Sequence, residues 1–265
     1  MHVIDKYIKD IEPRIQEIIE KSNNLEGATL QTSLAAYGWI LLDSWIAWRT
    51  LRYLLRCTSI DDAVQKRWVQ TPSSYRSDNL RAAWNFTDSA IDYLASETDS
   101  GSFQHLIDSI IQPKRNSSAH YSKIGNIIGT DIKKIKDCFK AFSTVFLAYE
   151  IDSFINRIKT ILSENGYKNF NIILNDTPIT NIKDNVSGFA KPGTLIISCT
   201  KSDDAYNYEI KSNQEGCQAR KVTTPDSEWY DVYNETIQQY YLWDNKGFYL
   251  DAKLFCDTVM TCWSK

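Results

Sequence analysis

The chain has 265 residues, of which 43% are hydrophobic and 24% are charged, and its formal net charge at pH 7 is −3. This composition is typical of a globular protein. It excludes a chain that binds nucleic acid through its overall charge, so any such ligand must lie on a local basic patch.

The sequence contains no signal for a membrane, a metal or export. No apolar run approaches the roughly 18 residues of a membrane span, and the N-terminal MHVIDKYIKD lacks the apolar core of a signal peptide. The six cysteines include no C-x-x-C pair, and with only three histidines they do not predict a zinc site. We therefore expect a cytoplasmic protein with no metal or other cofactor and no membrane contact.

Residues 1 to about 163 show helical periodicity almost throughout. Isoleucines at steps of three and four predict an amphipathic first helix, which Asn23-Asn24 and Gly27 end. A second helix is predicted over residues 28–56, and its middle, AAYGWILLDSWIAWRTLRYLL, is apolar nearly all round. Such a helix is typical of the centre of a bundle or of a dimer interface.

Shorter helices are predicted in the next part of the chain. One ends at about Gln70, and another runs through residues 80–94. The segment SFQHLIDSIIQ predicts a third, which we expect to stop at Pro113 because proline cannot donate a backbone hydrogen bond. Thr130-Asp131 can then cap a long last helix that reaches Leu162.

Beyond Asn165-Gly166 the pattern changes to short β-branched or aromatic runs separated by turn residues. NFNIILN, GTLIISCT, YNYEIKS and ARKVTT are predicted strands, YDVYNETIQQYYLW is a predicted helix, and the tail from Gly247 has no assigned element. The sequence therefore predicts a mainly α protein. Residues 1–163 are expected to be all-helical, and residues 167–265 to form a smaller α+β domain whose role the sequence does not assign.

One segment, P-K-R-N-S-S-A-H-Y-S-K, carries the clearest functional pattern. Arg115 is followed at once by the polar Asn116 and five positions later by His120, which the small Ala119 precedes. This pattern resembles the signature of the HEPN superfamily, and so does its position between earlier helices and a long final helix. The resemblance covers residues 1–163 and implies a helical bundle that cleaves RNA without a metal. The C-terminal domain resembles no family.

The residue types suit cleavage of RNA, which carries its own nucleophile, the 2′-hydroxyl. Imidazole has an ordinary pKa of about 6.5, so His120 can act as a general acid or base near neutrality. The guanidinium of Arg115 stays charged and can bind two phosphate oxygens as negative charge develops. Asn116 can orient the histidine or the phosphate through its amide. The predicted catalytic residues are Arg115, Asn116 and His120.

The resemblance also implies a partner and a biological role. In the HEPN superfamily two protomers usually face each other across a cleft, so we expect a homodimer formed through the helix 28–56 or the last helix. Enzymes of this type commonly serve as toxins or antiviral effectors. The expected partners are therefore an RNA substrate, a second copy of the chain, and an antitoxin or other regulatory protein.

Basic residues surround the motif. Residues 112–136 contain six lysines and arginines against one acidic residue, which would suit an RNA backbone. An ordinary solvated helix face would show the same excess. The predicted RNA-binding side chains are Lys114, Lys123, Lys133 and Lys134.

Two further residues are candidates for supporting roles. Asp43 lies among large apolar residues in the second helix, where it can orient His120 or can pair with Arg49 or Arg52 in a structural role. Tyr121 follows the histidine and can stack on a base or pack in the fold. Toxins of this superfamily that are paired with nucleotidyltransferase antitoxins have their modified tyrosine one position later, where this chain has Ser122.

Two other functions remain open at this point. The helical domain can be a catalytically inactive HEPN-like module that binds a nucleotide, RNA or a protein. The Arg115–His120 spacing can also be accidental, in a helical adaptor protein. Toxicity on expression that a change of His120 relieves would favour the enzyme.

Overall fold

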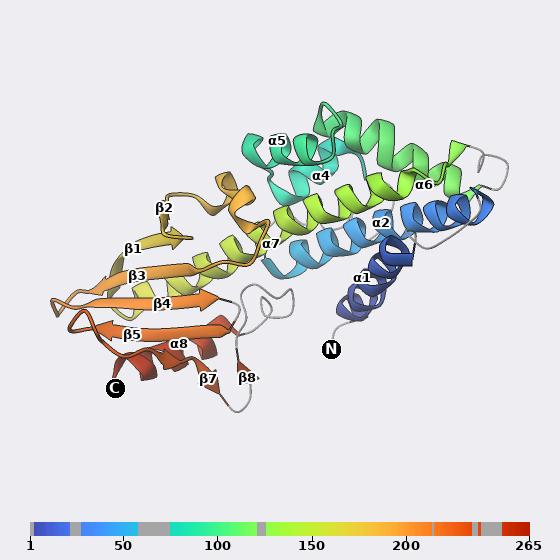
Figure 1. Ribbon diagram of the computed structural model, residues 1–265. Helices are drawn as coiled ribbons and strands as arrows, with labels where there is room; N and C mark the ends of the chain where they lie inside the picture. Colours follow the sequence, from blue (N-terminus) through green and yellow to red (C-terminus); the bar gives the residue numbers. More distant parts are fainter. Residues whose placement is uncertain are drawn as a thin grey trace. The chain divides into compact units, whose positions relative to one another are not determined.

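The computed structural model describes residues 3–21, 28–57, 75–120, 126–213, 215–234, 238–239 and 251–265. The chain divides into two compact units, Met1–Phe146 and Leu147–Lys265. The long helix α7 (Asp131–Glu164) contributes to both (Figure 1). The predicted end of the helical domain lies at the end of α7, whereas the division between the units lies inside this helix.

The described residues are mainly helical, as predicted, but the term all-helical is wrong for the chain. The second unit contains a six-stranded antiparallel sheet. Along strand β3 (Leu195–Lys201), buried Leu195, Ile197 and Cys199 alternate with partly exposed residues. This period of two, carried by β-branched residues, favours a half-buried strand over a helix.

Helices build the first unit. They are α1 (Val3–Lys21), α2 (Ala28–Cys57), α4 (Ser77–Trp84), α5 (Asp88–Glu97), the π-helix η2 (His105–Ile111), α6 (Gln112–Ala119) and the N-terminal part of α7. The predicted stripe of α1 is buried at Ile8, Ile15 and Ile18, and α1 packs on α2. None of the helices in the described ranges combines the length and the apolar character that crossing a membrane requires.

Aromatic side chains fill the core of the first unit around Trp84. Its indole stacks on Tyr53 with ring centroids 4.0 Å apart and on Phe146 at 4.2 Å. The indole Nε1 donates a hydrogen bond to Thr50 Oγ1 at 2.8 Å. The polar atom of this buried ring is therefore satisfied, and the ring joins α2, α4 and α7.

The helix predicted through residues 80–94 is two helices, α4 and α5, with a break between them. Asn85 adopts the left-handed conformation, with φ 51° and ψ 53°, and Thr87 caps α5 by accepting a hydrogen bond from the backbone of Ala90. Asparagine tolerates the left-handed region better than most residues, and threonine is a favoured N-cap. Two local signals thus override the apolar period that runs across the break. The predicted helix that ends near Gln70 lies outside the described residues.

The expected stop at Pro113 is also wrong. The π-helix η2 continues directly into α6, and Pro113 occupies the first turn of α6. The amide of Gln112 bonds to the carbonyl of Ile107, five residues earlier, as a π-turn requires. Proline is tolerated in the first turn of a helix, where its missing N–H is not needed and its φ suits the helix. The segment that carries the arginine is therefore helical.

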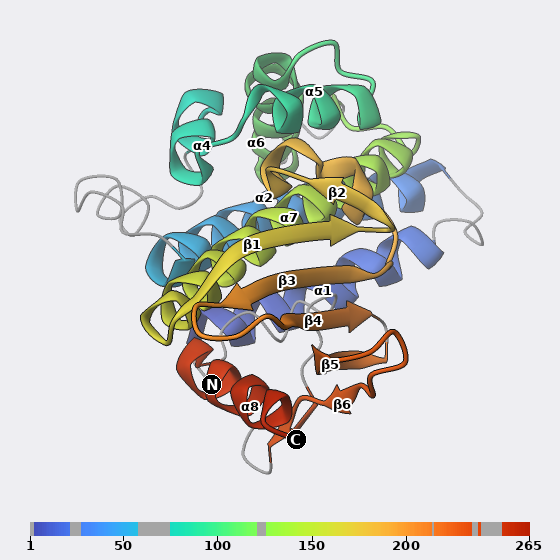
Figure 2. The same ribbon diagram turned by 90° about the vertical axis from the view of Figure 1, so that its left-hand side faces the viewer.

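The six-stranded sheet forms the centre of the second unit. Its strands are β1 (Tyr167–Leu174), β2 (Thr177–Ile179), β3, β4 (Asn207–Asn213), β5 (Gly216–Val222) and β6 (Tyr230–Asp231), in the order β2-β1-β3-β4-β5-β6 (Figure 2). The four predicted strands coincide with β1, β3, β4 and β5. A separate two-stranded pair joins β7 (Tyr233–Asn234) to β8 (Gln238–Gln239).

One face of the sheet packs against helices. The helix α8 (Ala252–Trp263) contacts β5, and its Phe255 packs on Phe154 of α7 with ring centroids 5.3 Å apart. Trp263, at the end of α8, contacts Tyr208 of β4 and Tyr167 of β1 at centroid distances of 5.1 Å and 4.9 Å. These contacts form the second core.

Near the C-terminus, the structure differs from the prediction in two places. The segment YDVYNETIQQYYLW was expected to be helical, but all its described residues except Val232 lie in β6, β7 and β8. Its tyrosines and valine favour strands when a neighbouring strand can pair with them, as β5 pairs with β6. The tail instead contains a helix, α8, which Asp251 caps by accepting hydrogen bonds from the amides of Lys253 and Leu254.

We expect Trp84→Ala to lower the free energy of unfolding by about 3–5 kcal/mol, because it leaves a cavity among three helices. Chemical denaturation followed by tryptophan fluorescence and circular dichroism measures the loss. Leu55→Ala, at a position on α2 that is 44% exposed, is the control and should cost less than about 1 kcal/mol. Equal effects of the two substitutions would contradict the assignment of Trp84 to the core.

Candidate functional site

The predicted motif lies at the end of one helix. Arg115 and Asn116 belong to α6, which ends at Ala119, and His120 follows it with an extended backbone of φ −120° and ψ 113°. The amide of His120 bonds to the carbonyl of Ser117 at 3.4 Å. The imidazole is exposed to solvent. The histidine is thus presented on the residue at which the chain leaves the helix.

Arg115 is held by a buried carboxylate. Its Nε lies 3.4 Å from Oδ2 of Asp43, which belongs to α2 and is 0% exposed. Its Nη1 donates a hydrogen bond to Oδ1 of Asn116 at 3.1 Å. Nη2 has no hydrogen-bond partner among the described residues. The guanidinium is therefore anchored on one side and can bind an anion on the other.

The carboxylate of Asp43 has two further partners. Nε2 of Gln112, one turn before Arg115 on α6, donates a hydrogen bond to Oδ1 at 3.0 Å. The buried hydroxyl of Tyr75, which precedes α4, also interacts with this carboxyl group. Burial raises the pKa of Asp43 to about 6, and the charge of Arg115 together with the donors from Tyr75 and Gln112 opposes this rise. The group titrates close to neutrality because desolvation exceeds the attraction of its partners.

These contacts bear on the two roles considered for Asp43. Its carboxylate contacts the arginine of the motif, and no hydrogen bond joins it to His120 among the described residues. Arg49, one of the two structural partners considered, donates from Nη1 to Glu12 at 3.1 Å. The structure therefore places the carboxylate of Asp43 against the guanidinium of Arg115.

The structure brings together only part of the predicted catalytic set. Arg115 contacts Asn116 and the supporting candidate Asp43, and the amide oxygen of Asn116 accepts a hydrogen bond from Arg115. Within the described part of the protomer, no side-chain hydrogen bond links His120 to either motif residue. A phosphate placed between Arg115 and His120 would have to bridge them, since they do not contact each other directly.

The predicted RNA-binding lysines differ in their surroundings. Lys114 is half-buried and bonds to Asp131 and to the carbonyl of Asn126, both at 2.8 Å. Lys134 donates to the carbonyls of Thr98 and Asp99, just beyond the end of α5. Both ammonium groups thus join parts of the fold, and the basic surface is smaller than the sequence suggested. Lys133 is exposed, and Lys123 lies outside the described residues, as does Tyr121.

Two residues of this cluster were missed at the sequence level. Gln112 lies three positions before Arg115, so both side chains project from the same face of α6. That spacing is a signal that could have identified it. Tyr75 has no such signal, because its contact with Asp43 depends on how the segment before α4 packs against α2.

No protein-family model, curated protein or solved structure matches this chain.

The raised pKa of Asp43 predicts a pH-dependent stability. The folded protein binds the carboxyl proton more tightly than the unfolded chain, whose aspartates have a pKa near the model value of 3.8. Ionisation therefore destabilises the fold as the pH rises. Relative to Asp43→Asn, the parent should lose up to about 3 kcal/mol of unfolding free energy between about pH 4 and pH 7.

Denaturant titrations of both proteins at a series of pH values measure this difference. Asp78→Asn, at an exposed position of α4, is the control for loss of a carboxylate. If the parent instead gained unfolding free energy relative to Asp43→Asn as the pH rose, Arg115 would stabilise the carboxylate by more than its burial costs.

Proposed function

We propose that this chain is a metal-independent endoribonuclease of the HEPN type, with Arg115 at the phosphate and His120 as a general acid or base. The observation that carries the proposal is the guanidinium of Arg115, fixed by buried Asp43 and open on one side. An exposed histidine stands at the end of the same helix. A fixed cation and an imidazole that can accept or donate a proton are the groups that phosphodiester cleavage requires.

The reaction needs no group beyond these side chains and the RNA. A base removes the proton of the 2′-hydroxyl, and the 2′-oxygen attacks the adjacent phosphorus. The bond to the 5′-oxygen breaks, and an acid protonates that leaving oxygen. The products are a 2′,3′-cyclic phosphate and a 5′-hydroxyl end. Arg115 would neutralise the charge that builds on the non-bridging oxygens, and Asn116 would fix the orientation of the guanidinium.

Proton transfer at two oxygens favours two histidines at one site. His120 is the histidine of the motif in each protomer, and its exposed position would allow a second copy to approach. We therefore propose a homodimer in which two Arg115–His120 pairs face one cleft. Lys133 is a candidate for additional backbone contacts. A cytoplasmic role as a toxin or antiviral effector, restrained by an antitoxin or another regulatory protein, follows from the resemblance alone.

One observation favours the alternative of an inactive binding module. Lys114 and Lys134 are occupied by contacts within the chain, which leaves a small cationic surface for a long RNA. The same Arg115 could then bind the phosphate of a nucleotide or a single acidic group of a partner protein without chemistry. Cleavage assays separate the two functions, because only the enzyme depends on His120 for product formation.

In the presence of EDTA, we expect the purified protein to cleave RNA into fragments that end in cyclic phosphates. His120→Ala should lower the rate by about 100-fold or more, since general acid–base catalysis contributes at least this much. The matched control is His105→Ala, which changes another exposed histidine, on η2. Gel and mass analysis of the fragments measures the rates and the end groups. Cleavage at the parental rate by His120→Ala, or cleavage that requires a metal, would refute the proposal.

We also expect the active species to have twice the mass of one chain, because a complete site needs two protomers. Light scattering coupled to size-exclusion chromatography measures this mass, with the cleavage assay performed on the same fractions. Activity that elutes with the monomer would contradict the shared site while leaving the role of His120 intact.

A further inference from the structure

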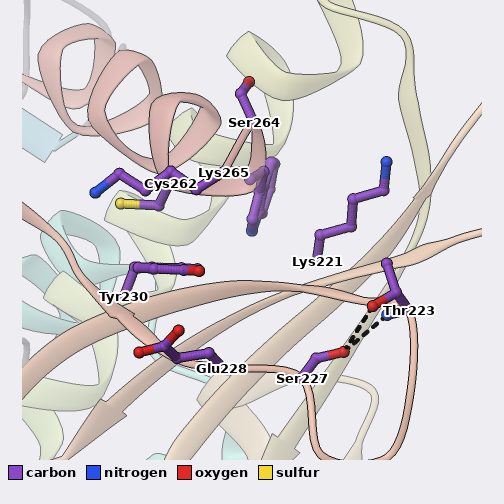
Figure 3. Close-up of a pocket in the computed structure, with 9 residues that line it drawn as sticks. Lys221, Thr223, Ser227, Glu228, Tyr230, Cys262, Ser264 and Lys265 are labelled. Carbon is purple, nitrogen blue, oxygen red and sulfur yellow. Dashed lines mark hydrogen bonds between the residues drawn. The ribbon is translucent and has the colours of Figure 1, made fainter.

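The second unit contains a cavity of about 320 Å³ between the end of β5, the turn that follows it, β6 and the last turn of α8 (Figure 3). Its two lysines lie on opposite sides. Nζ of Lys221 is 4.2 Å from the ring centre of Tyr206, and Nζ of Lys265 is 5.0 Å from that of Tyr230. The charge of Lys221 also interacts with the carboxylate of Asp204. The cavity therefore brings no pair of cations to one anion.

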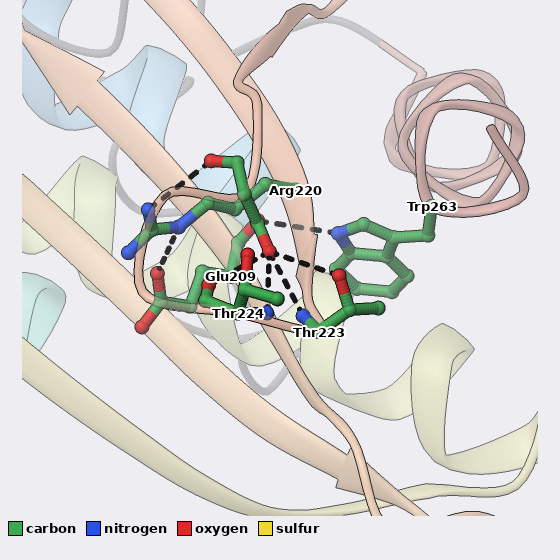
Figure 4. Close-up of polar contacts among 6 residues, drawn as sticks. Glu209, Arg220, Thr223, Thr224 and Trp263 are labelled. Atoms are coloured by element: carbon green, nitrogen blue, oxygen red, sulfur yellow. Dashed lines mark hydrogen bonds and ion pairs between the residues drawn. The ribbon is translucent and has the colours of Figure 1, made fainter.

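Polar groups beside this cavity bond to one another (Figure 4). Nε of Arg220 donates a hydrogen bond to the carboxylate of Glu209 at 2.7 Å, and Nε1 of Trp263 donates to the backbone carbonyl of Glu209 at 3.2 Å. The hydroxyls of Thr223 and Ser227 bond to each other at 3.1 Å. These contacts join the sheet, the turn after β5 and α8, so their role is to stabilise the second unit.

Arg115 of the first unit is held in a different way. Its Nε lies 3.4 Å from Oδ2 of Asp43, and its Nη1 donates to Oδ1 of Asn116 at 3.1 Å. The guanidinium is planar and rigid, so contacts at two of its nitrogens also fix the direction of the third, Nη2. The side chain of Arg115 is 30% exposed, whereas that of Asp43 is 1% exposed. The direction of Nη2 thus depends on the orientation of a buried carboxylate.

Gln112 fixes the orientation of that carboxylate. The torsion of an aspartate side chain about Cβ–Cγ is broad, so the carboxylate can turn at little cost. Nε2 of Gln112 donates a hydrogen bond to Oδ1 of Asp43 at 3.0 Å, and Oδ2 then faces Arg115. Gln112 and Arg115 are three positions apart on α6, so they project from one face of this helix. Together they hold both oxygens of a single carboxylate on α2.

We propose that Gln112 is a positioning residue of the ribonuclease site, which directs the guanidinium of Arg115 toward the phosphate by holding Oδ1 of Asp43. The inference rests on the proposed function. Gln112 acts through Asp43 and needs no contact with the RNA. Loss of its amide would free the carboxylate to turn, and Nη2 of Arg115 would lose its fixed direction.

The amide of Gln112 also favours the ionised form of Asp43. Burial raises the pKa of Asp43 to about 6, against the charge of Arg115 and the hydrogen bonds from Tyr75 and Gln112. Cys138 of α7 faces Tyr75, and its thiol stays neutral because burial raises its pKa to about 12. Without the donor of Gln112, Asp43 would bind its proton more tightly, and a neutral carboxyl group attracts the guanidinium less.

NMR of the full chain, labelled with ¹⁵N at arginine, tests the contact without any reaction. The Nε–Hε signal of Arg115 is assigned by its absence from Arg115→Lys. In the parent we expect slow exchange of Hε with water and a shift distinct from those of exposed arginines. Gln112→Met removes the amide and should speed this exchange. The matched control, Gln104→Met at an exposed position before η2, should leave the signal unchanged. An unchanged signal in Gln112→Met would overturn the proposal.

Kinetics then measure whether the contact serves the reaction. At pH 7 we expect Gln112→Met to lower kcat for RNA cleavage by roughly tenfold or more with little change in KM, because misplacing a group by about 1 Å costs up to about 100-fold. The acid limb of its pH–rate profile should move to higher pH, since Asp43 then ionises at higher pH. In an Asp43→Asn background the same substitution should leave kcat unchanged, because Gln112 acts through that carboxylate.

A purely structural role for Gln112 would lower the unfolding free energy of Gln112→Met and leave kcat and the pH profile of the folded variant at their parental values. That result would refute the positioning role, even if the NMR signal of Arg115 changed. A parent that cleaves no RNA would refute the ribonuclease itself. The NMR signal would then decide by itself whether Gln112 fixes the guanidinium.

Discussion

The buried carboxylate of Asp43 is the constraint on which the candidate site depends. Removing a charged group from water costs several kcal/mol unless other groups compensate for the lost hydration. Here the compensation comes from Arg115, Gln112 and Tyr75, so a single group ties α2, the segment before α4 and α6 together. Both partners on α6 must face α2, and this requirement sets the rotation of α6 about its axis. The exit of the chain at His120 follows from that rotation.

The π-helix before the motif allows this helix to contain a proline. A proline within a regular helix removes a hydrogen bond and collides with the preceding turn. In this chain the π-turn ends at Ile111, and Pro113 follows it within the first turn of α6. π-turns within helices often lie at functional sites, because they shift the side chains that follow. The geometry of Gln112 and Arg115 at Asp43 thus depends on an irregularity one turn earlier.

In the second unit, the apolar core and the polar residues lie on different parts of the sheet. Apolar residues of β1, β3 and β4 alternate toward α7 and α8, whereas polar residues collect beyond the end of β5. There Trp263 closes the core with its ring and bonds to the sheet with its nitrogen. The cavity lies at this boundary, where lysines can reach it without being buried in the core. Each unit therefore has cationic side chains of its own: Arg115 in the first unit, and Lys221 and Lys265 in the second.

The sequence by itself determined the elements whose pattern is local. The apolar α2, the strands β1, β3, β4 and β5, and the spacing of Arg115, Asn116 and His120 were all readable because periodicity and spacing depend only on near neighbours. The break at Asn85 was misread because one residue's left-handed conformation outweighed the apolar pattern around it, whereas at Pro113 the helix continues through a residue that usually ends one. The strand β6 was misread because its partner, β5, lies outside the segment, and β7 and β8 pair only with each other, over two residues each. Only the tertiary structure decided that Gln112 and Tyr75 meet Asp43 and that Lys221 and Lys265 share a cavity. These contacts join residues far apart in the chain, and packing alone brings them together.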